Sequence, residues 1–241
     1  LKPIHEEFFS SISDFKAGLA LYRKSSRSGV ITTEGKVLIP PEYQALEIDH
    51  GHFRACLDTG GKNRWIILDA AGKRITEKQY EYIGAFNGKF YPVKNRGYWG
   101  AVNGEGEEVI TCVHDSLVEE SNSNVVVKFK GEYGVINLLE NWLVTPQPHR
   151  LKLLNQDAYL EFSGKTTFLK SFRGDIIYFS DNPLEYHDGY IREQLTSGAY
   201  WIIDMSGIII DRSNQPSAAE KIFPESEGLR AILKDGKYGF I

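Results

Sequence analysis

The segment Tyr98–Ile110, YWGAVNGEGEEVI, combines an aromatic residue, a glycine, a short apolar run, a glycine turn and a second apolar pair. Taken alone, its glycines and carboxylates would also suit a phosphate loop or an acid/base site. Close variants of its first half occur at SGVIT (28–32), RWIILD (64–69), YGVIN (133–137), AYWIID (199–204) and KYGFI (237–241). The segment therefore belongs to a repeat, and its pattern predicts a strand, a glycine turn and another strand.

Seven copies can be aligned on the position of Gly100, which we call the glycine slot. Successive slots lie about 34 residues apart. The seven slots are Gly29, Ile66, Gly100, Gly134, Thr167, Trp201 and Gly239. A second, aliphatic anchor precedes each slot at Ile12, Leu46, Ile83, Leu117, Leu151, Leu184 and Ile222. Two anchors that recur in step over the whole chain indicate a true repeat.

Each repeat contains three short strand signals, which in the third repeat are Ala85–Val93, Tyr98–Asn103 and Glu107–Ile110. Short apolar runs separated by turn glycines are typical of strands, and no segment shows a sustained helical period. The sequence therefore predicts an all-β fold. We expect residues 1–241 to form a single domain of seven β-repeat units, each a small three-stranded sheet.

The Trp99-Gly100 pair and its flanks resemble the WG-containing (KWG) repeat family, which is found mainly in bacteria. The chain departs from the family pattern, because only the third repeat reads Trp-Gly and the second, fifth and sixth repeats lack the glycine. The resemblance implies a non-catalytic β-repeat module that is often appended to other domains. It implies no catalytic residue.

We expect the seven units to close into a propeller-like ring, with an open β-repeat array as the alternative. Leu1–Ile4 stands before Phe9 as Arg74-Ile75 stands before Tyr80, so it is interpreted as the missing third strand of the seventh repeat. A strand added in this way would remove exposed sheet edges.

Composition excludes some classes of partner. The formal net charge of −4 provides no basic surface for nucleic acid. No apolar run approaches the roughly 18 residues of a membrane-spanning helix.

Isolated motifs favour no catalytic, cofactor or metal site. Asp58-Thr59-Gly60 occurs once and is interpreted as a hairpin loop, since an aspartic protease needs two such aspartates. His50 and His52 lack further ligands in the same repeat phase. The Glu107-Glu108 pair is interpreted as a solvated turn.

These patterns predict a repeat scaffold for protein–protein interaction, as part of a larger protein or assembly. The alternative is a carbohydrate or cell-wall binder that uses exposed aromatic side chains. An enzyme would require residues from several repeats to converge.

The expected contact region is where the repeat pattern fails, because local rules tend to break at functional sites. After the fifth repeat loses both its aromatic residue and its glycine, the segment Ile176–Arg192 contains four aromatic residues. Tyrosine and arginine are enriched in interaction hot spots. We expect a partner protein to contact Tyr186, His187, Tyr190 and Arg192, although sequence drift in a tolerant repeat is the competing explanation.

Overall fold

The computed structural model describes residues 9–121, 123–187, 189–213, 221–226, 229–234 and 236–240. All regular secondary structure in these residues is β-strand. The described residues contain no helix long and apolar enough to cross a membrane. The chain divides into two compact units. One comprises Leu1–Leu117, Val127–Lys130 and Leu138–Asn141, and the other comprises Val118–Val126, Gly131–Asn137 and Trp142–Ile241. A single domain over the whole chain stays a prediction.

The strands of the first three repeats are as follows. Repeat 1 contains β1 (Ser11–Ile12), β2 (Leu19–Lys24), β3 (Arg27–Thr32) and β4 (Val37–Tyr43). Repeat 2 contains β5 (Ala45–Asp49), β6 (His52–Asp58) and β7 (Asn63–Leu68). Repeat 3 contains β8 (Tyr82–Ile83), β9 (Phe90–Asn95), β10 (Tyr98–Asn103) and β11 (Glu108–His114).

The remaining repeats follow the same order. Repeat 4 contains β12 (Ser116–Ser121), β13 (Asn124–Phe129), β14 (Glu132–Asn137) and β15 (Trp142–Gln147). Repeat 5 contains β16 (Arg150–Leu153), β17 (Ala158–Ser163), β18 (Thr166–Ser171) and β19 (Ile176–Ser180). Repeat 6 contains β20 (Leu184–His187), β21 (Tyr190–Gln194), β22 (Tyr200–Asp204) and β23 (Ile209–Ser213). Repeat 7 contains β24 (Lys221–Ser226), β25 (Leu229–Lys234) and β26 (Lys237–Phe240).

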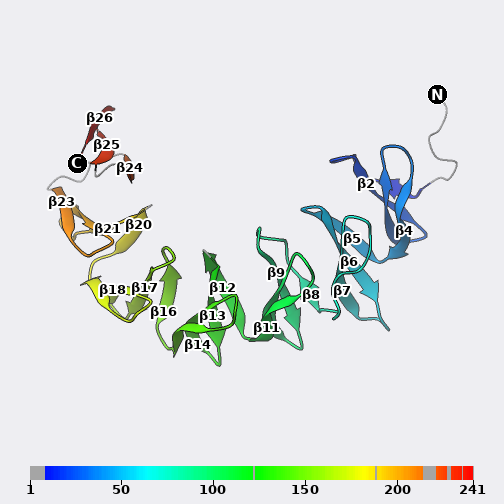
Figure 1. The fold of residues 1–241 in the computed structure, drawn as a ribbon, viewed down its shortest axis with the longest axis horizontal. Coiled ribbons are helices and arrows are strands. Elements are labelled where there is room, and N and C mark those ends of the chain that lie inside the picture. The colour runs from blue at the N-terminus through cyan, green and yellow to red at the C-terminus, as the bar shows by residue number, and fades with distance from the viewer. Residues whose placement is uncertain are drawn as a thin grey trace. The chain divides into compact units, whose positions relative to one another are not determined.

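Each repeat forms its own antiparallel sheet, with strands in chain order (Figure 1). The aliphatic anchor lies on the first strand of every sheet and the glycine slot lies on the third. The predicted seven β units are therefore confirmed. The prediction of three strands per unit was wrong for five repeats, whose sheets have four strands. The missed strand carries the anchor, and it can be as short as two residues (β1 and β8), too short to show an alternating pattern.

The glycine slot allows the last strand of a repeat to approach the third strand closely. A Cβ atom added at Gly100 would lie 2.4 Å from the carbonyl oxygen of Ile110 and 2.8 Å from the backbone nitrogen of Cys112. At Gly29 it would lie 2.5 Å from the carbonyl oxygen of Ile39. The register between the third and last strands shifts twice beside both glycines, so the last strand is bulged there. Glycine is required because backbone, not a movable side chain, occupies the space of the Cβ.

The register of repeat 5 places its slot one residue later than the sequence alignment did. Its turn is closed by a hydrogen bond from the Gly174 N–H to the Ser171 carbonyl, as the turn of repeat 3 is closed from Gly106 to Asn103. Counting back three residues from each turn start equates Phe168, rather than Thr167, with Gly100. The sequence alignment placed the slot at Thr167 because the residue two positions later, Leu169, is aliphatic as in the other repeats. In the structure Leu169 is a buried residue of β18 that comes only one position after the slot.

A second glycine joins successive repeats. Gly106 has a φ of 88°, and a Cβ added to it would lie 2.3 Å from the carbonyl oxygen of Ile75 in the preceding repeat. Gly207 stands in the same relation to the carbonyl oxygen of Ile177. Both the positive φ and the close backbone contact favour glycine at this turn.

The larger hydrophobic clusters lie between consecutive sheets, and smaller ones lie within repeat 1 and within repeat 6. One cluster joins repeats 1 and 2 through Val30, Phe53 and Leu68, and another joins repeats 5 and 6 through Leu160 and Ile203. A small sheet cannot bury its apolar faces alone, so each repeat depends on its neighbours.

The predicted joining strand Leu1–Ile4 lies outside the described residues. Each sheet described consists of consecutive strands, and closure of a ring stays a prediction.

Candidate functional site

The four residues predicted to contact a partner all lie on the β20–β21 hairpin of repeat 6, but they differ in accessibility. Tyr190 is only 6% exposed and belongs to a core cluster with Tyr200 and Ile202. His187 pairs with Tyr190 across the hairpin, and the two rings stack with centroids 5.4 Å apart. His187 is exposed, so its ring covers the buried tyrosine on the solvent side.

The other two predicted residues also make internal contacts. The Arg192 guanidinium lies 4.5 Å from the centre of the Tyr200 ring, a cation–π contact. Tyr186 is half-buried against the core of repeats 5 and 6. The hairpin thus brings the four side chains together, with Tyr190 in the core and His187 at the surface. Whether a partner contacts them stays a prediction.

A more exposed apolar surface lies just before this hairpin, on β19 of repeat 5. Phe179 is 62% exposed and Ile176 is 56% exposed. Phe179 pairs with Phe168 on β18, and their ring centroids are 5.9 Å apart. We call Phe168, Ile176 and Phe179 the β19 surface.

The segment Ile176–Arg192, singled out in the sequence, includes β19, but Ile176 and Phe179 were not among the predicted contact residues. Their neighbours Ile177 and Tyr178 pack inward against the core of repeats 5 and 6. A single register shift next to Leu169 sets which residues of β19 face solvent. The run IIYF in the sequence does not alternate, and no local signal indicates where the bulge lies.

A buried carboxylate anchors β19 to the next repeat. Glu193 on β21 is 2% exposed and accepts hydrogen bonds from the Tyr178 hydroxyl at 2.5 Å, from the Asn182 amide at 2.7 Å and from the Ser180 hydroxyl. Burial and the adjacent Glu193 carboxylate raise the pKa of Tyr178, so its hydroxyl stays a donor. The β19 surface is therefore held on a rigid support.

Repeat 5 contains a second buried carboxylate in the equivalent position. Glu161 faces Phe168 across the sheet, as Glu193 faces Trp201. Its oxygens accept hydrogen bonds from Lys170 at 2.7 Å, Gln147 at 3.1 Å and His149 at 2.9 Å. Burial by itself raises the pKa of Glu161, but the three hydrogen bonds outweigh it and the net pKa is lowered.

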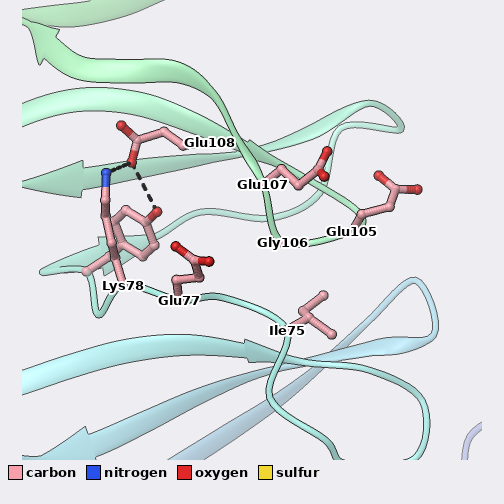
Figure 2. A pocket seen from close by; sticks show the side chains of 8 residues that line it. Ile75, Glu77, Lys78, Glu105, Gly106, Glu107 and Glu108 are labelled. Atoms are coloured by element: carbon pink, nitrogen blue, oxygen red, sulfur yellow. Dashed lines mark hydrogen bonds and ion pairs between the residues drawn. The ribbon is translucent and has the colours of Figure 1, made fainter.

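A pocket of about 290 Å³ in the other compact unit is lined by residues of repeats 2 and 3 (Figure 2). Glu108 accepts hydrogen bonds there from the Lys78 ammonium at 2.8 Å and the Tyr80 hydroxyl at 3.3 Å (Figure 2). The side chain of Glu108 is only 17% exposed. The interpretation of Glu107-Glu108 as a solvated turn was therefore wrong for Glu108, which crosslinks two repeats.

Cys112, on β11 beside this pocket, is not an activated nucleophile. Burial, followed by the nearby Glu108 charge, raises the pKa of the Cys112 thiol to about 11. Cys112 is consequently a neutral thiol at physiological pH, and thiolate chemistry is not available to it.

Two motifs weighed in the sequence have structural roles. Asp58-Thr59-Gly60 forms the β6–β7 hairpin loop, in which the Gly61 N–H donates to Asp58 Oδ1 at 3.0 Å. This loop confirms the hairpin interpretation. His50 Nδ1 lies 2.8 Å from Asp49 Oδ1.

One aromatic pair on repeat 3 faces solvent in part. The rings of Tyr82 and Trp99 meet edge to face with centroids 5.7 Å apart, and Tyr82 is 47% exposed. Lys94 lies between them in the sheet, with its ammonium 5.6 Å from the centre of the Trp99 ring.

The repeat pattern also matches a known sequence family. The family described as WG containing repeat matches residues 29–58 and 67–99, and the first match begins at the glycine slot of repeat 1. Two segments, which together span parts of repeats 1 to 3, thus match the WG-containing repeat. No sequence among curated proteins matches it significantly.

Solved structures that match this chain share little sequence with it. The designed protein Ika8 is 14% identical, with 98% of this chain and 85% of that chain covered and a TM-score of 0.38. BamB from Moraxella catarrhalis is 13% identical, with 93% and 81% covered and a TM-score of 0.36. Hsv2 from Kluyveromyces lactis is 8% identical, with 92% and 89% covered and a TM-score of 0.38. Scores of this size carry no argument about function.

Proposed function

We propose that the chain is a non-catalytic repeat scaffold that binds another protein through the β19 surface. The observation that carries this proposal is the exposure of Ile176 and Phe179 on β19, the last strand of its sheet. An exposed apolar edge strand is a site at which another chain can add by backbone pairing. Large apolar side chains on a rigid strand also provide contact area at low entropic cost.

The hydrogen bonds that fix β19 favour a binding role for the β19 surface over sequence drift as the explanation for its exposed residues. Tyr178 and Ser180 stand on either side of Phe179 and both donate hydrogen bonds to Glu193. The strand is thus preorganised, and binding need not order it. A mobile apolar loop of the same composition would lose part of its binding free energy to ordering.

The test compares a double variant, Ile176→Ser with Phe179→Ser, against wild type. Proteins that copurify with the intact protein are purified and rebound to both forms, with affinity measured by calorimetry. Loss of two exposed apolar anchors should weaken a genuine partner at least tenfold.

The matched control is Val113→Ser with Val118→Ser, which removes two half-exposed apolar side chains from repeats 3 and 4. It should bind as wild type does. Unchanged affinity of every reconstituted partner for the β19 variant would contradict the proposal.

We further propose that the neighbouring hairpin contributes through His187 and Tyr186. Because Tyr190 is buried, replacing it would test folding rather than contact. The informative variant is His187→Ala, because His187 is exposed whereas Tyr186 packs against the core, and it should reduce affinity with little change in melting temperature. Equal affinity for wild type and this variant would remove the hairpin from the interface.

The Tyr82–Trp99 pair favours carbohydrate binding as a second candidate function. Exposed aromatic rings can stack on sugar rings, and Tyr82 presents nearly half of its surface. Tyr82→Ala should abolish binding to any glycan that the wild type binds. A glycan that binds both forms equally would exclude this site.

We also propose that the seven sheets close into a propeller-like ring. If residues 1–4 complete the sheet of repeat 7, deletion of residues 1–9 should lower the melting temperature clearly, since a paired edge would be lost. An unchanged melting temperature would favour an open array.

A further inference from the structure

The last strand of repeat 2 is the least regular in the first compact unit. It is reduced to two isolated bridges, Trp65 with Tyr80 and Leu68 with Arg74. Between them the Ile67 N–H donates to the Thr76 hydroxyl at 3.2 Å, where repeat 3 has the backbone pair Ala101 and Ile110. The slot residue here is Ile66, which is buried in the core between repeats 1 and 2. The Ile75 N–H still donates to the Ile67 carbonyl at 3.0 Å and the Tyr80 N–H donates to the Trp65 carbonyl at 2.9 Å, and the segment from Thr76 to Gln79 is displaced between these two points.

This displaced segment lines an open groove of about 800 Å³ beside the pocket of Figure 2. Four cationic side chains line the groove: Arg64, Arg74, Lys78 and Arg96. Two carboxylates, Glu77 and Glu108, also line it. The lining therefore carries an excess of two positive charges in a chain whose net charge is −4.

Two of these cations keep their charge available. Arg74 donates to the carbonyl oxygens of Thr76 at 2.6 Å and Glu77 at 2.5 Å, and these bonds orient the guanidinium without neutralising it. Arg96 is exposed in the turn between β9 and β10. In the part of the chain that the structure describes, neither arginine forms an ion pair.

The other charges of the groove are largely satisfied internally. Lys78 and Glu108 pair at 2.8 Å, and Arg64 Nη1 lies 3.5 Å from Glu81 Oε1. A hydrogen bond from the Gly97 N–H, with Arg64 nearby, lowers the pKa of Glu81, which keeps this carboxylate ionised and paired. Once these two pairs are set aside, the lining carries Arg74 and Arg96 against the single carboxylate of Glu77, which leaves an excess of one positive charge for a ligand.

We propose that this groove binds an acidic peptide segment of a partner protein, with Arg74 and Arg96 as the carboxylate-binding residues. The forked guanidinium group binds carboxylate oxygens in pairs and stays charged at any physiological pH. The cations come from separate segments along a groove far larger than a single small anion, which favours several carboxylates on an extended chain. This site is independent of the β19 surface, which lies in the other compact unit.

The probe is a fluorescein-labelled hexaglutamate peptide, with hexalysine as the opposite-charge control. Binding to the intact protein is followed by fluorescence anisotropy in low salt and again in high salt. We expect hexaglutamate to bind, hexalysine not to bind, and high salt to weaken the complex because exposed charges are screened. Replacement of both arginines, Arg74→Gln with Arg96→Gln, should weaken binding at least tenfold.

The matched control is Lys165→Gln with Arg173→Gln, which removes two exposed cations from repeat 5. It changes the net charge equally and should alter the affinity less than twofold. If Arg74→Gln unfolds the protein, Arg96→Gln alone should still weaken binding about threefold, since Arg96 is exposed. The proposal is overturned if hexaglutamate does not bind in low salt, if the control pair weakens binding as much, or if inorganic phosphate binds while the peptide does not.

Discussion

Repeats 3 and 5 share one design but end in different last strands. In repeat 3 the slot is Gly100, and the register of β11 against β10 shifts twice beside it. In repeat 5 the slot is Phe168, which pairs directly with Phe179, and the register of β19 shifts only once. The repeat with glycine at the slot therefore has a last strand with two register shifts, and the repeat with phenylalanine at the slot has a last strand with one.

The difference has a consequence for the surface. Where glycine allows the bulge, backbone atoms of the last strand fill the space above the slot. Where Phe168 takes the slot, Phe179 pairs directly with it and points to solvent with 62% of its surface exposed. The two repeats that lack the glycine thus end differently: repeat 5 presents an apolar surface on β19, and the last strand of repeat 2 is reduced to two isolated bridges beside a groove.

The largest expected effect tests the glycine of repeat 3. Gly100→Ala should destabilise the protein by about 3 kcal/mol, because its Cβ meets backbone at 2.4 Å and the strand must shift. Chemical denaturation measures this change. Gly104→Ala is the matched control, since its Cβ would find its nearest neighbours at 3.9 Å, and it should change stability by less than about 0.5 kcal/mol. Equal losses in both variants would show that close packing at the slot is not the cause.

A smaller effect is expected from the reverse change in repeat 5. Phe168→Gly should cost about 2 kcal/mol, since it removes the ring that packs on Phe179 and places a flexible residue inside a strand. The same denaturation assay applies. A gain in stability would mean that a glycine slot is preferred even where the last strand pairs regularly, and it would break the comparison.

The smallest effect concerns the charge that repeat 5 buries and repeat 3 lacks. The position of Glu161 opposite the slot is taken by Val93 in repeat 3. Because the pKa of Glu161 is lowered in the folded state, its contribution to stability is present at neutral pH and is lost as the pH falls through that pKa.

Wild type should therefore lose more stability than Glu161→Gln between pH 7 and pH 4, as measured by urea unfolding at each pH. Parallel losses would show that Glu161 is not the group that titrates.

Much of the fold could be predicted from the sequence because the repeat encodes local needs. Three kinds of position recur at a fixed spacing and can be seen in the sequence. They are the glycine under the bulge, the turn glycine with positive φ such as Gly106, and the aliphatic anchor such as Ile83. The first strand was missed because two residues show no period. The slot of repeat 5 was displaced because Leu169 satisfied the aliphatic rule one residue early.

The candidate surfaces could not be predicted in the same way. Tyrosine and arginine content drew attention to Tyr190 and Arg192, but composition does not distinguish a buried ring from an exposed one. Phe179 lies on a strand with one register shift, and Arg74 lines a groove where the last strand of repeat 2 is reduced to two isolated bridges. Both depend on which strand lies beside which.

By itself, the sequence determined the seven repeats, the all-β class and the turns, because these follow from backbone conformations that individual residues allow. Tertiary structure alone decided which apolar and charged side chains reach the surface. Cores here form between sheets, so the burial of any residue depends on a neighbour some 34 residues away. A shift of one residue in the register between two strands exchanges the side chains that face the core with those that face solvent.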